Sequence, residues 1–550
     1  MSLLTRNPAL TGLALSAANL AKSAALDNYG LFLRLSAAPS DLGDELSPFG
    51  ALRAAEHARR RVPAYRDFLA ERAWRDDPRL TVQERLRLLP VMDKESYVKR
   101  FSTEQRCLDG RLPMVGTTVD ESSGSSGTPY NWVRGTAELH DVHRELGQFA
   151  RYCFGANVIT INGFSMGSWA TGVNTGEAMR AIGVVKSTGP DVDKILHTLE
   201  FFGPAYRYII TGYPPFLKHL LDLGEARGFD WAAYRMDAIV GGEGMSEGLR
   251  AYLERRFRRV ISGYGASDID IGVAGELPLS VWIRKHAAEN PALRAALFGD
   301  DPRLPMLFHY NPLDYYVETN VERELILTVN RLAVLSPRIR YNIHDTGGVI
   351  SFKRMLDVLR DFGLDPLEDG RRRGLPHVRL PFLYLFGRSD STFSYMGANI
   401  YPEDVEQALY ADAADAAHLG AYCLELVEIG RGEQRPCVHV EILPAPPDDD
   451  GALAGRLRGR VVDRLLANSR DFREAVREDA TAGDIVVRLH AAGTGPFAAN
   501  SGRIKRRYIL KGMATTASHV PAAVSAVSSS TRSATLDHPR GHDVAANERI

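Results

Sequence analysis

Short apolar runs alternate with amphipathic stretches through the middle of this chain. β-Branched and aromatic residues are concentrated in 206–211, 237–240 and 259–262, whereas apolar residues recur at helical spacing in 214–223 and 246–257. Strand and helix signals that take turns in this way predict parallel strands joined by helices that cover the faces of one sheet.

The two ends of the chain show other patterns. Helical spacing in 8–21 and 51–74 predicts an N-terminal helical region. Beyond residue 388 the pattern predicts a small α+β domain, with helices at 402–410 and 453–466 and strands at 421–429, 437–443 and 485–489. In the second of these strands Val438, Val440 and Ile442 are expected to face inward, and His439 and Glu441 outward.

We therefore expect an α/β fold, with a large N-terminal domain of β-sheets flanked by helices and a small, mobile C-terminal α+β domain. The expected divisions are 1–110 for the helical region of the large domain, 111–388 for its core, 389–512 for the small domain and 513–550 for a tail. The tail is Ala/Ser-rich and polar without periodicity, which is typical of a disordered segment.

Composition excludes some classes of function. The 550 residues are 45% hydrophobic, and 67 Lys+Arg balance 68 Asp+Glu, so we expect a large core and no binding of nucleic acid or an anionic membrane. No run of eighteen apolar residues occurs, so we expect no membrane span. Residues 8–21 faintly resemble a signal peptide, but a helix in a cytoplasmic protein is the preferred interpretation. The four cysteines lack the spacing of a zinc or redox motif and are expected to be buried thiols.

The stretch 119–130 carries the clearest chemistry. Its small hydroxyl residues and glycines allow backbone N–H groups to surround phosphates, although the Gly-Lys-Ser/Thr of a Walker loop is missing. The residues expected to do so are Ser122, Ser123, Gly124, Ser125, Ser126, Gly127 and Thr128. A flexible loop is the alternative interpretation.

Two further glycine clusters follow predicted strands, at 241–242 and 263–265. Ligands of open α/β sheets bind where strands end, so these clusters are expected to share one pocket with the Ser/Gly loop. Helix caps would explain isolated glycines equally well.

Nine motifs occur in order over roughly residues 50–512. They are Arg61-Val-Pro-Ala-Tyr65, Leu89-Pro-Val-Met-Asp-Lys94, Ser122-Ser-Gly-Ser-Ser-Gly-Thr-Pro129, Gly241-Gly-Glu243, Tyr264-Gly-Ala-Ser-Asp268, Glu324-Leu-Ile-Leu-Thr328, Arg340-Tyr-Asn-Ile-His-Asp345, Gly387-Arg-Ser-Asp390 with Gly397-Ala-Asn-Ile-Tyr-Pro402, and Ser501-Gly-Arg-Ile-Lys505. In this order they resemble the motifs of the adenylate-forming superfamily, most closely those of its phenylacetate–CoA ligase-like branch.

The resemblance implies attack of a carboxylate on the α-phosphorus of ATP with Mg²⁺, giving an acyl-AMP and pyrophosphate. It implies that Tyr264 lies against adenine, that Asp345 accepts from the ribose hydroxyls and that Asp268 holds Mg²⁺. Arg388 is implied to contact the ribose or phosphates, and Asp390 to be the hinge. The remaining residues of the implied nucleotide site are Gly241, Gly242, Glu243, Gly265 and Ser267. Core packing for Tyr264, a turn for Asp345 and a surface ion pair for Arg388 are the structural alternatives.

Four positions depart from the family pattern. Thr128 stands where Lys is common, Asp268 where Glu is usual, His344 where Gly is usual and Arg503 where the catalytic lysine belongs. Asp270 is a candidate to compensate for the shorter Asp268.

The catalytic cation is therefore open between Arg503 and Lys505. A guanidinium is broad and delocalised, whereas an ammonium is a compact charge that fits between carboxylate and α-phosphate. Lys505 points to the same side as Arg503 if the segment is extended, so a shift of the loop would deliver it.

Aromatic residues near predicted strand ends suggest an acyl pocket for an aryl or arylacetic acid, with core packing as the alternative. They are Phe164, Trp169, Tyr213 and Phe216.

The expected function is ATP-dependent activation of a carboxylic acid in the cytoplasm, with transfer to coenzyme A. Adenylation followed by transfer to an amine or other nucleophile is one alternative, and a non-catalytic nucleotide-binding relative is another. A homodimer stays open.

Overall fold

The computed structural model describes residues 8–38, 41–121, 130–167, 170–301, 303–366, 368, 377–388, 393–395, 398–428, 434–443, 450–478, 480–500 and 508–510. The fold is α/β, and all of these residues belong to one compact unit that ends at Lys511. The expected tail lies outside the described residues. Domain boundaries at 110, 388 and 512 stay predictions.

The large sheet has eleven strands among the described residues, in the order β10-β11-β12-β13-β9-β8-β7-β6-β5-β3-β4. Its strands β3 to β7 are parallel neighbours, and every pair from β7 to β10 through β8, β9, β13, β12 and β11 is antiparallel. The bounds are β3 Val158–Asn162, β4 Gly183–Ser187, β5 Arg207–Gly212, β6 Arg235–Gly241, β7 Val260–Ala266, β8 Asp270–Gly275, β9 Met306–Tyr310, β10 Tyr315–Thr319, β11 Glu324–Val329, β12 Tyr341–Ile350 and β13 Phe382–Arg388.

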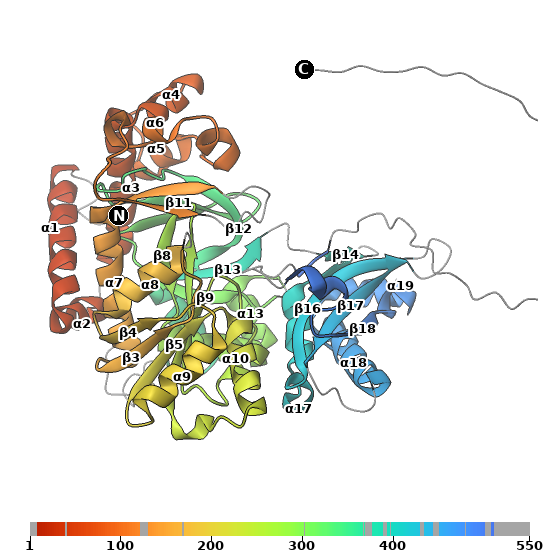
Figure 1. The fold of residues 1–550 in the computed structure, drawn as a ribbon. Coiled ribbons are helices and arrows are strands. Elements are labelled where there is room, and N and C mark those ends of the chain that lie inside the picture. Colours follow the sequence, from red (N-terminus) through yellow and green to blue (C-terminus); the bar gives the residue numbers. More distant parts are fainter. Residues whose placement is uncertain are drawn as a thin grey trace, which may run out of the picture. The chain divides into compact units, whose positions relative to one another are not determined.

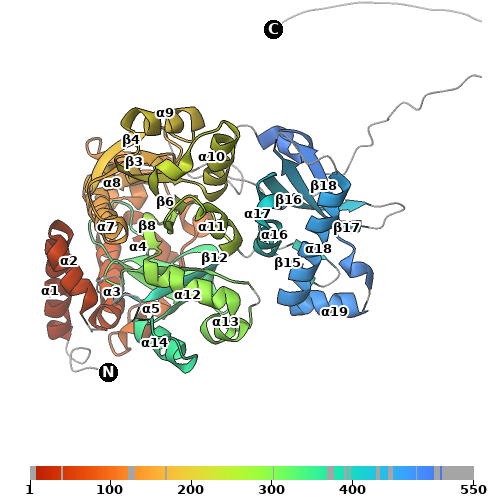
Figure 2. The ribbon, with the colours of Figure 1, turned by 90° about the horizontal axis from the view of Figure 1, so that it is seen from below.

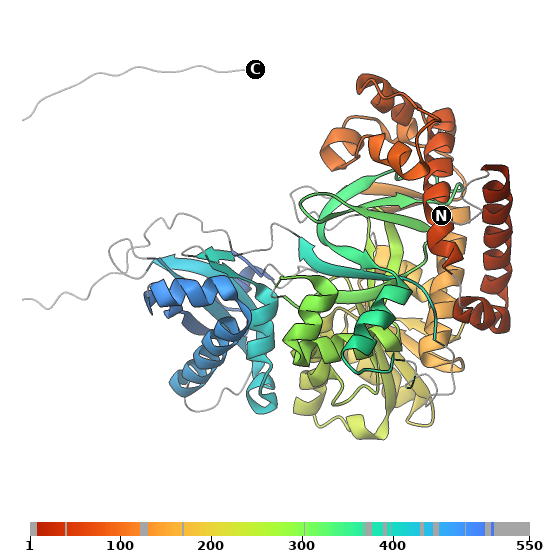
Figure 3. The same ribbon diagram turned by 180° about the vertical axis from the view of Figure 1, so that it is seen from behind.

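Helices surround this sheet (Figure 1). Their bounds are α1 Pro8–Asp27, α2 Tyr29–Ala37, α3 Leu42–Arg61, α4 Pro63–Glu71, α5 Val82–Leu88, α6 Thr103–Arg106, α7 Thr136–Phe154, α8 Ala170–Met179, α9 Val192–Phe202, α10 Pro214–Ala226, α11 Glu247–Leu253, α12 Pro278–Glu289, α13 Pro291–Phe298 and α14 Phe352–Asp361. Figures 1 and 3, seen from opposite sides, both place α1 and α2 on the outer side of the helical layer, and α1 contacts α3 and α7. Figure 2 shows α12, α13 and α14 grouped together, where they share one apolar core.

Both faces of the inner parallel strands β3, β5 and β6 are largely buried, as their continuous apolar runs predict, whereas the edge strand β4 is largely exposed. In β5 the successive residues Tyr208, Ile209 and Ile210 alternate between two apolar clusters. Tyr208 and Ile210 pack with residues of α9 and α10, whereas Ile209 packs with residues of α7 and α2. The period of two along a strand therefore assigns helices to each face.

The expected helix at 51–74 is two helices. α3 ends at Arg61 and α4 begins at Pro63, with extended backbone at Val62. Proline has no N–H to donate and disfavours helical backbone in the residue before it. The helix therefore ends before Pro63 and a new one begins there, although the spacing of apolar residues continues across the break.

A hairpin stands apart from the large sheet. It consists of β1 (Thr117–Glu121) and β2 (Asn131–Gly135), which pair antiparallel, and the Ser/Gly loop joins them. The loop itself lies outside the described residues.

The C-terminal part has its own three-stranded sheet and apolar core. Its elements are β14 Phe393–Tyr395, β15 Ala398–Ile400, α16 Pro402–Leu409, α17 Ala413–Ala416, β16 Leu419–Glu428, β17 Gln434–Ile442, α18 Asp450–Asn468, α19 Arg470–Glu478 and β18 Val486–Ala491. These match the predicted order of helices and strands closely.

One predicted orientation here is wrong. His439 of β17 is buried, with 3% of its surface exposed, rather than facing outward. Its Nδ1 lies 2.9 Å from Nε2 of His490, and its Nε2 lies 3.2 Å from Oε2 of Glu425. Burial lowers the pKa of His439 to about 4. This face of the sheet is covered by residues that follow β18, among them Phe497, so both faces of β17 are enclosed.

The four cysteines are free and buried, as predicted. Among the helices that the structure describes, none combines the length and apolarity needed to cross a membrane.

Candidate active site

The predicted glycine clusters lie side by side at the carboxyl ends of two neighbouring strands. Gly241 ends β6, and it pairs with Gly263 of β7. Gly242 has φ +83°, and a Cβ there would lie 2.5 Å from a ring carbon of Tyr213. A Cβ on Gly265 would lie 2.0 Å from the carbonyl oxygen of Ile271. Glycine at 242 and 265 therefore permits close packing around this edge of the sheet.

Two predicted nucleotide-binding residues from distant motifs meet here. The hydroxyl of Tyr264 donates to Oδ2 of Asp345 over 2.7 Å. Tyr264 is buried and its ring stacks on Phe308, with ring centroids 5.8 Å apart. Asp345 is half-buried on β12, where it stands directly opposite Arg388 of β13. Tyr264 thus packs as a core residue while its hydroxyl orients Asp345, and its stacking on adenine stays a prediction.

Asp268 lies in the turn between β7 and β8. It is half-buried, and its Oδ2 accepts a hydrogen bond of 3.1 Å from the hydroxyl of Tyr341. Burial raises the pKa of Tyr341 well above its ordinary value, so this hydroxyl keeps its proton and acts as a donor. The neighbouring Ser267 presents its main-chain carbonyl to Arg134. β12 therefore supports both carboxylates, Asp268 through Tyr341 and Asp345 directly.

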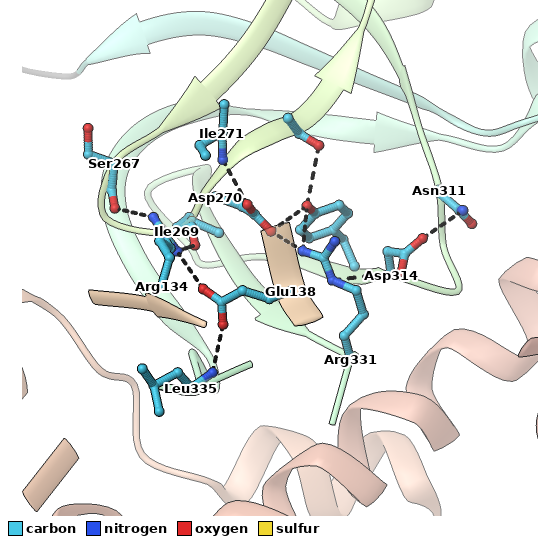
Figure 4. A network of polar contacts seen from close by, with 12 residues as sticks. Arg134, Glu138, Ser267, Ile269, Asp270, Ile271, Asn311, Asp314, Arg331 and Leu335 are labelled. Atoms are coloured by element: carbon cyan, nitrogen blue, oxygen red, sulfur yellow. Dashed lines mark hydrogen bonds and ion pairs between the residues drawn. The ribbon is translucent and has the colours of Figure 1, made fainter. Parts of the chain in front are cut away.

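Asp270 does not compensate for the shorter reach of Asp268. Its carboxylate accepts hydrogen bonds from the hydroxyl of Tyr315 at 2.9 Å, from the N–H of Ile271 at 2.8 Å and from Arg331 (Figure 4). The side chain is buried, with 7% exposed. The carboxylate is committed to this network, so that part of the sequence interpretation is wrong.

His344 adopts φ +64°, a conformation that glycine takes without cost. Its Nδ1 lies 3.0 Å from Oε1 of Glu324. Burial alone would raise the pKa of Glu324, but hydrogen bonds from Asn342, His344 and Asn320 hold that pKa below its ordinary value. The departure from glycine at 344 is therefore accommodated by a local contact beside Asp345.

Glu243 contacts the last described residues of the chain. The hydroxyl of Tyr508 donates to Oε2 of Glu243 over 2.7 Å. Residues 508–510 lie along β16, because Leu424 donates to the carbonyl of Tyr508 at 2.7 Å and Leu510 donates to the carbonyl of Leu424 at 2.8 Å. The chain that directly follows 501–507 is thus held beside the Gly-Gly-Glu motif.

Three of the predicted acyl-pocket residues gather at the ends of β3 and β5. The rings of Phe164 and Tyr213 meet edge to face with centroids 5.5 Å apart, and both residues are buried. Phe216 is half-buried on α10, and Cβ atoms added at Gly163 and Gly212 would approach its ring to 3.2 and 2.9 Å. Burial raises the pKa of Tyr213.

Several predicted site residues lie outside the described residues, and their roles stay predictions. They are Ser122, Ser123, Gly124, Ser125, Ser126, Gly127, Thr128, Trp169, Asp390, Arg503 and Lys505; of Arg388 only the backbone is described.

The sequence interpretation missed the polar residues that support the site. Tyr341 and Tyr508 contact predicted site residues through their hydroxyls. Arg134 and Arg338 bind the turn that carries Asp268. The available signal was an arginine within the apolar stretch Trp132-Val-Arg134, directly after the Ser/Gly loop.

The donor set fits magnesium held mainly by phosphates. In the described part of the chain no three His, Cys, Asp or Glu side chains gather as a metal site. Mg²⁺ commonly takes only one or two protein carboxylates and completes its shell with water and substrate phosphates. The single half-buried carboxylate of Asp268 suits that arrangement.

No protein-family model and no curated protein matches the chain. Among solved structures, 2-hydroxyisobutyryl-CoA ligase in the postadenylation state with R3-HIB-AMP is similar over 86% of this chain and 91% of that one, at 12% identity and a TM-score of 0.62. The same ligase with 2-HIB-AMP gives 13% identity, coverage of 85% and 89%, and a TM-score of 0.62. Its open conformation with 2-HIB-AMP and CoA gives 14% identity, coverage of 86% and 93%, and a TM-score of 0.51. The chain therefore has the fold of the adenylate-forming enzymes.

The contact between Tyr264 and Asp345 leads to a prediction. Tyr264→Phe keeps the ring in the core but removes the hydrogen bond to a carboxylate, an interaction worth about 1.5–3 kcal/mol. This bond is present without nucleotide, so only the lost orientation of Asp345 affects binding, and we expect ATP affinity to fall several-fold in calorimetry. Tyr208→Phe is the control, because that hydroxyl contacts only the carbonyl of Gly203 among its described hydrogen bonds. Equal ATP affinity of the two variants would contradict the role of Tyr264.

Proposed function

We propose that this protein is an AMP-forming ligase that activates a carboxylic acid as its acyl-AMP. The observation that carries the proposal is the convergence of motifs far apart in the sequence. The hydroxyl of Tyr264 donates to Asp345, the backbone of Asp345 on β12 lies opposite that of Arg388 on β13, and Asp268 follows Tyr264 in the adjoining turn. The fold supports the same class of reaction.

In this proposal the residues divide the work of adenylation. The carboxylate oxygen of the acid attacks the α-phosphorus, and the bond from that phosphorus to the bridging oxygen of pyrophosphate breaks. Negative charge moves toward the leaving phosphates, so donors fixed beforehand lower the barrier. Residues 122–128 supply those donors, and Arg388 adds a cation. Asp345 accepts from the ribose hydroxyls and holds the nucleotide in place.

Magnesium is the proposed metal, with Asp268 as its protein ligand. When bound, a magnesium ion offsets the charge of the phosphate oxygens. Tyr341 keeps the carboxylate of Asp268 oriented through its hydroxyl.

The acid is proposed to be aryl or arylacetic, as in the phenylacetate–CoA ligase-like branch. Phe164, Tyr213 and Phe216 support this, because their rings offer apolar and edge-to-face contacts to an aromatic acid. Trp169 is proposed as a further wall.

Coenzyme A is the proposed acceptor. Its thiol attacks the acyl carbon, the bond from that carbon to the phosphate oxygen breaks, and AMP leaves. Arg503 or Lys505 supplies the cation of the first step, and rotation at Asp390 separates the two steps.

ATP–pyrophosphate exchange with a panel of carboxylic acids tests this function. We expect exchange that depends on one class of acid and on magnesium, and that needs no coenzyme A. A protein that binds ATP but exchanges no pyrophosphate with any acid would be a non-catalytic relative. Exchange followed by acyl transfer only to amines would replace coenzyme A as the acceptor.

A further inference from the structure

Three consecutive main-chain carbonyls of the turn that carries Asp268 accept hydrogen bonds from buried arginines. Arg134 donates from Nη2 to the carbonyl of Ser267 at 2.6 Å and from Nη1 to that of Ile269 at 2.7 Å. Arg338 donates from Nε to the carbonyl of Asp268 at 2.6 Å. Figure 4 shows Arg134 reaching both flanking carbonyls.

Arg134 is held firmly itself. Its side chain is 2% exposed, its Nε lies 3.4 Å from Oδ2 of Asp120, and its Nη1 lies 4.0 Å from Oε1 of Glu138. Glu138 in turn accepts from the N–H of Leu335 at 2.6 Å (Figure 4). A buried guanidinium with this many partners has little freedom to move, so it transmits position from one segment to another.

Arg134 joins the hairpin that carries the predicted phosphate-binding loop to the turn that carries the predicted metal ligand, Asp268. Arg134 is on β2, directly after the Ser/Gly loop, and Asp120 is on β1, directly before it. Arg338 also contacts this hairpin, because its guanidinium lies over the ring of Trp132, 4.9 Å from the centroid. Arg134 is therefore part of the hairpin and holds the turn, and Arg338 contacts both the hairpin and the turn.

We propose that Arg134 is a positioning residue that fixes the turn bearing Asp268 against the hairpin bearing the Ser/Gly loop, with Arg338 completing the clamp. The inference rests on the proposed function, because it assigns the turn to magnesium and the loop to phosphates. Partners behind a metal ligand orient it, and a loose turn would let Asp268 leave the position that magnesium needs.

Substitutions must separate positioning from general stability. Arg134→Lys keeps a positive charge beside Asp120 and Glu138, but one ammonium cannot replace a fork that holds two carbonyls. Arg338→Met removes the third donor, keeps an apolar contact to Trp132 and frees no carboxylate among its described contacts. Arg250→Lys is the matched control, because Arg250 is equally buried and binds Glu247, Glu276 and a main-chain carbonyl, but that carbonyl is at Val260, the opposite end of β7.

Two measurements besides activity report on the clamp. The first is the magnesium concentration for half-maximal binding of ATP, by calorimetry without the carboxylic acid. The second is hydrogen exchange of the peptide that spans 266–271. We expect Arg134→Lys and Arg338→Met to raise the magnesium requirement roughly 10- to 100-fold and to speed exchange in this peptide. Arg250→Lys is expected to change neither, at a comparable loss of thermal stability.

The outcomes are distinct. If Arg134→Lys and Arg338→Met both leave the magnesium requirement and the hydrogen exchange of residues 266–271 unchanged, the proposed clamp is wrong and the proposed function is not affected. A wild-type protein whose ATP binding ignores magnesium would overturn the proposed function instead. If Arg134→Lys does not fold, Arg338→Met decides the question by the same two measurements.

Discussion

Asp345→Ala is expected to remove measurable ATP–pyrophosphate exchange while the protein stays folded. The substitution deletes the acceptor of the Tyr264 hydroxyl and the proposed acceptor of the ribose hydroxyls. A hydrogen bond to a charged group is worth about 1.5–3 kcal/mol. Loss of two such bonds to the ribose hydroxyls of the nucleotide corresponds to a decrease in the rate of adenylation of roughly 10²-fold or more.

The graded variant Asp345→Asn keeps one acceptor oxygen and should lose less than Asp345→Ala. Asp237→Asn is the control, because Asp237 is a buried carboxylate of the same sheet that accepts from Arg258 at 2.7 Å and belongs to none of the nine motifs. Near-normal ATP affinity and exchange in Asp345→Ala, with the fold intact by circular dichroism, would refute the ribose assignment.

The second large effect concerns the cation in the loop that precedes Tyr508. If Lys505 is the working residue, Lys505→Ala should lower adenylation while Arg503→Ala changes it little, and the pattern reverses if Arg503 has that role. Only one charge fits between the carboxylate and the α-phosphate. Removal of a charge contact made in the transition state typically costs about 2.7–4 kcal/mol, or roughly 10²–10³ in rate.

Two rates are compared for each variant: pyrophosphate exchange, and turnover of a preformed acyl-adenylate. The second reaction bypasses the phosphate step, so its rate should change much less. Arg506→Ala is the control, because in an extended segment Arg506 points away from the side shared by Arg503 and Lys505. If neither Arg503→Ala nor Lys505→Ala alters exchange, the C-terminal loop does not hold the catalytic cation.

The fold was predictable because it depends on local patterns. Apolar runs such as β5 and the periodicity of α10 are visible without tertiary contacts, and Pro63 marks a helix break that periodicity alone conceals. The outward orientation of His439 was wrong because alternation identifies one apolar face, whereas the cover on the other face comes from residues more than fifty positions later.

The site was predictable only where motifs carry it. Tyr264 and Asp345, which the motifs select from positions 81 apart, meet in the structure, while their roles toward a nucleotide stay predictions. Asp270 resembles a second metal ligand in the sequence, but its use depends on Arg331 and Tyr315, which no local pattern connects to it. The contact between Tyr508 and Glu243 spans 265 positions and was invisible for the same reason.

The central claim is an acyl-AMP intermediate, and the fate of the carboxylate oxygens tests it most directly. The acid that supports exchange is labelled with ¹⁸O in both carboxylate oxygens and turned over with ATP and the acceptor. In the proposed reaction one carboxylate oxygen attacks phosphorus and stays there when the acceptor takes the acyl group. We therefore predict one ¹⁸O atom in the phosphate of AMP and one in the acyl product, by mass spectrometry. Unlabelled AMP, or label found in inorganic phosphate with ADP as the product, would contradict the account.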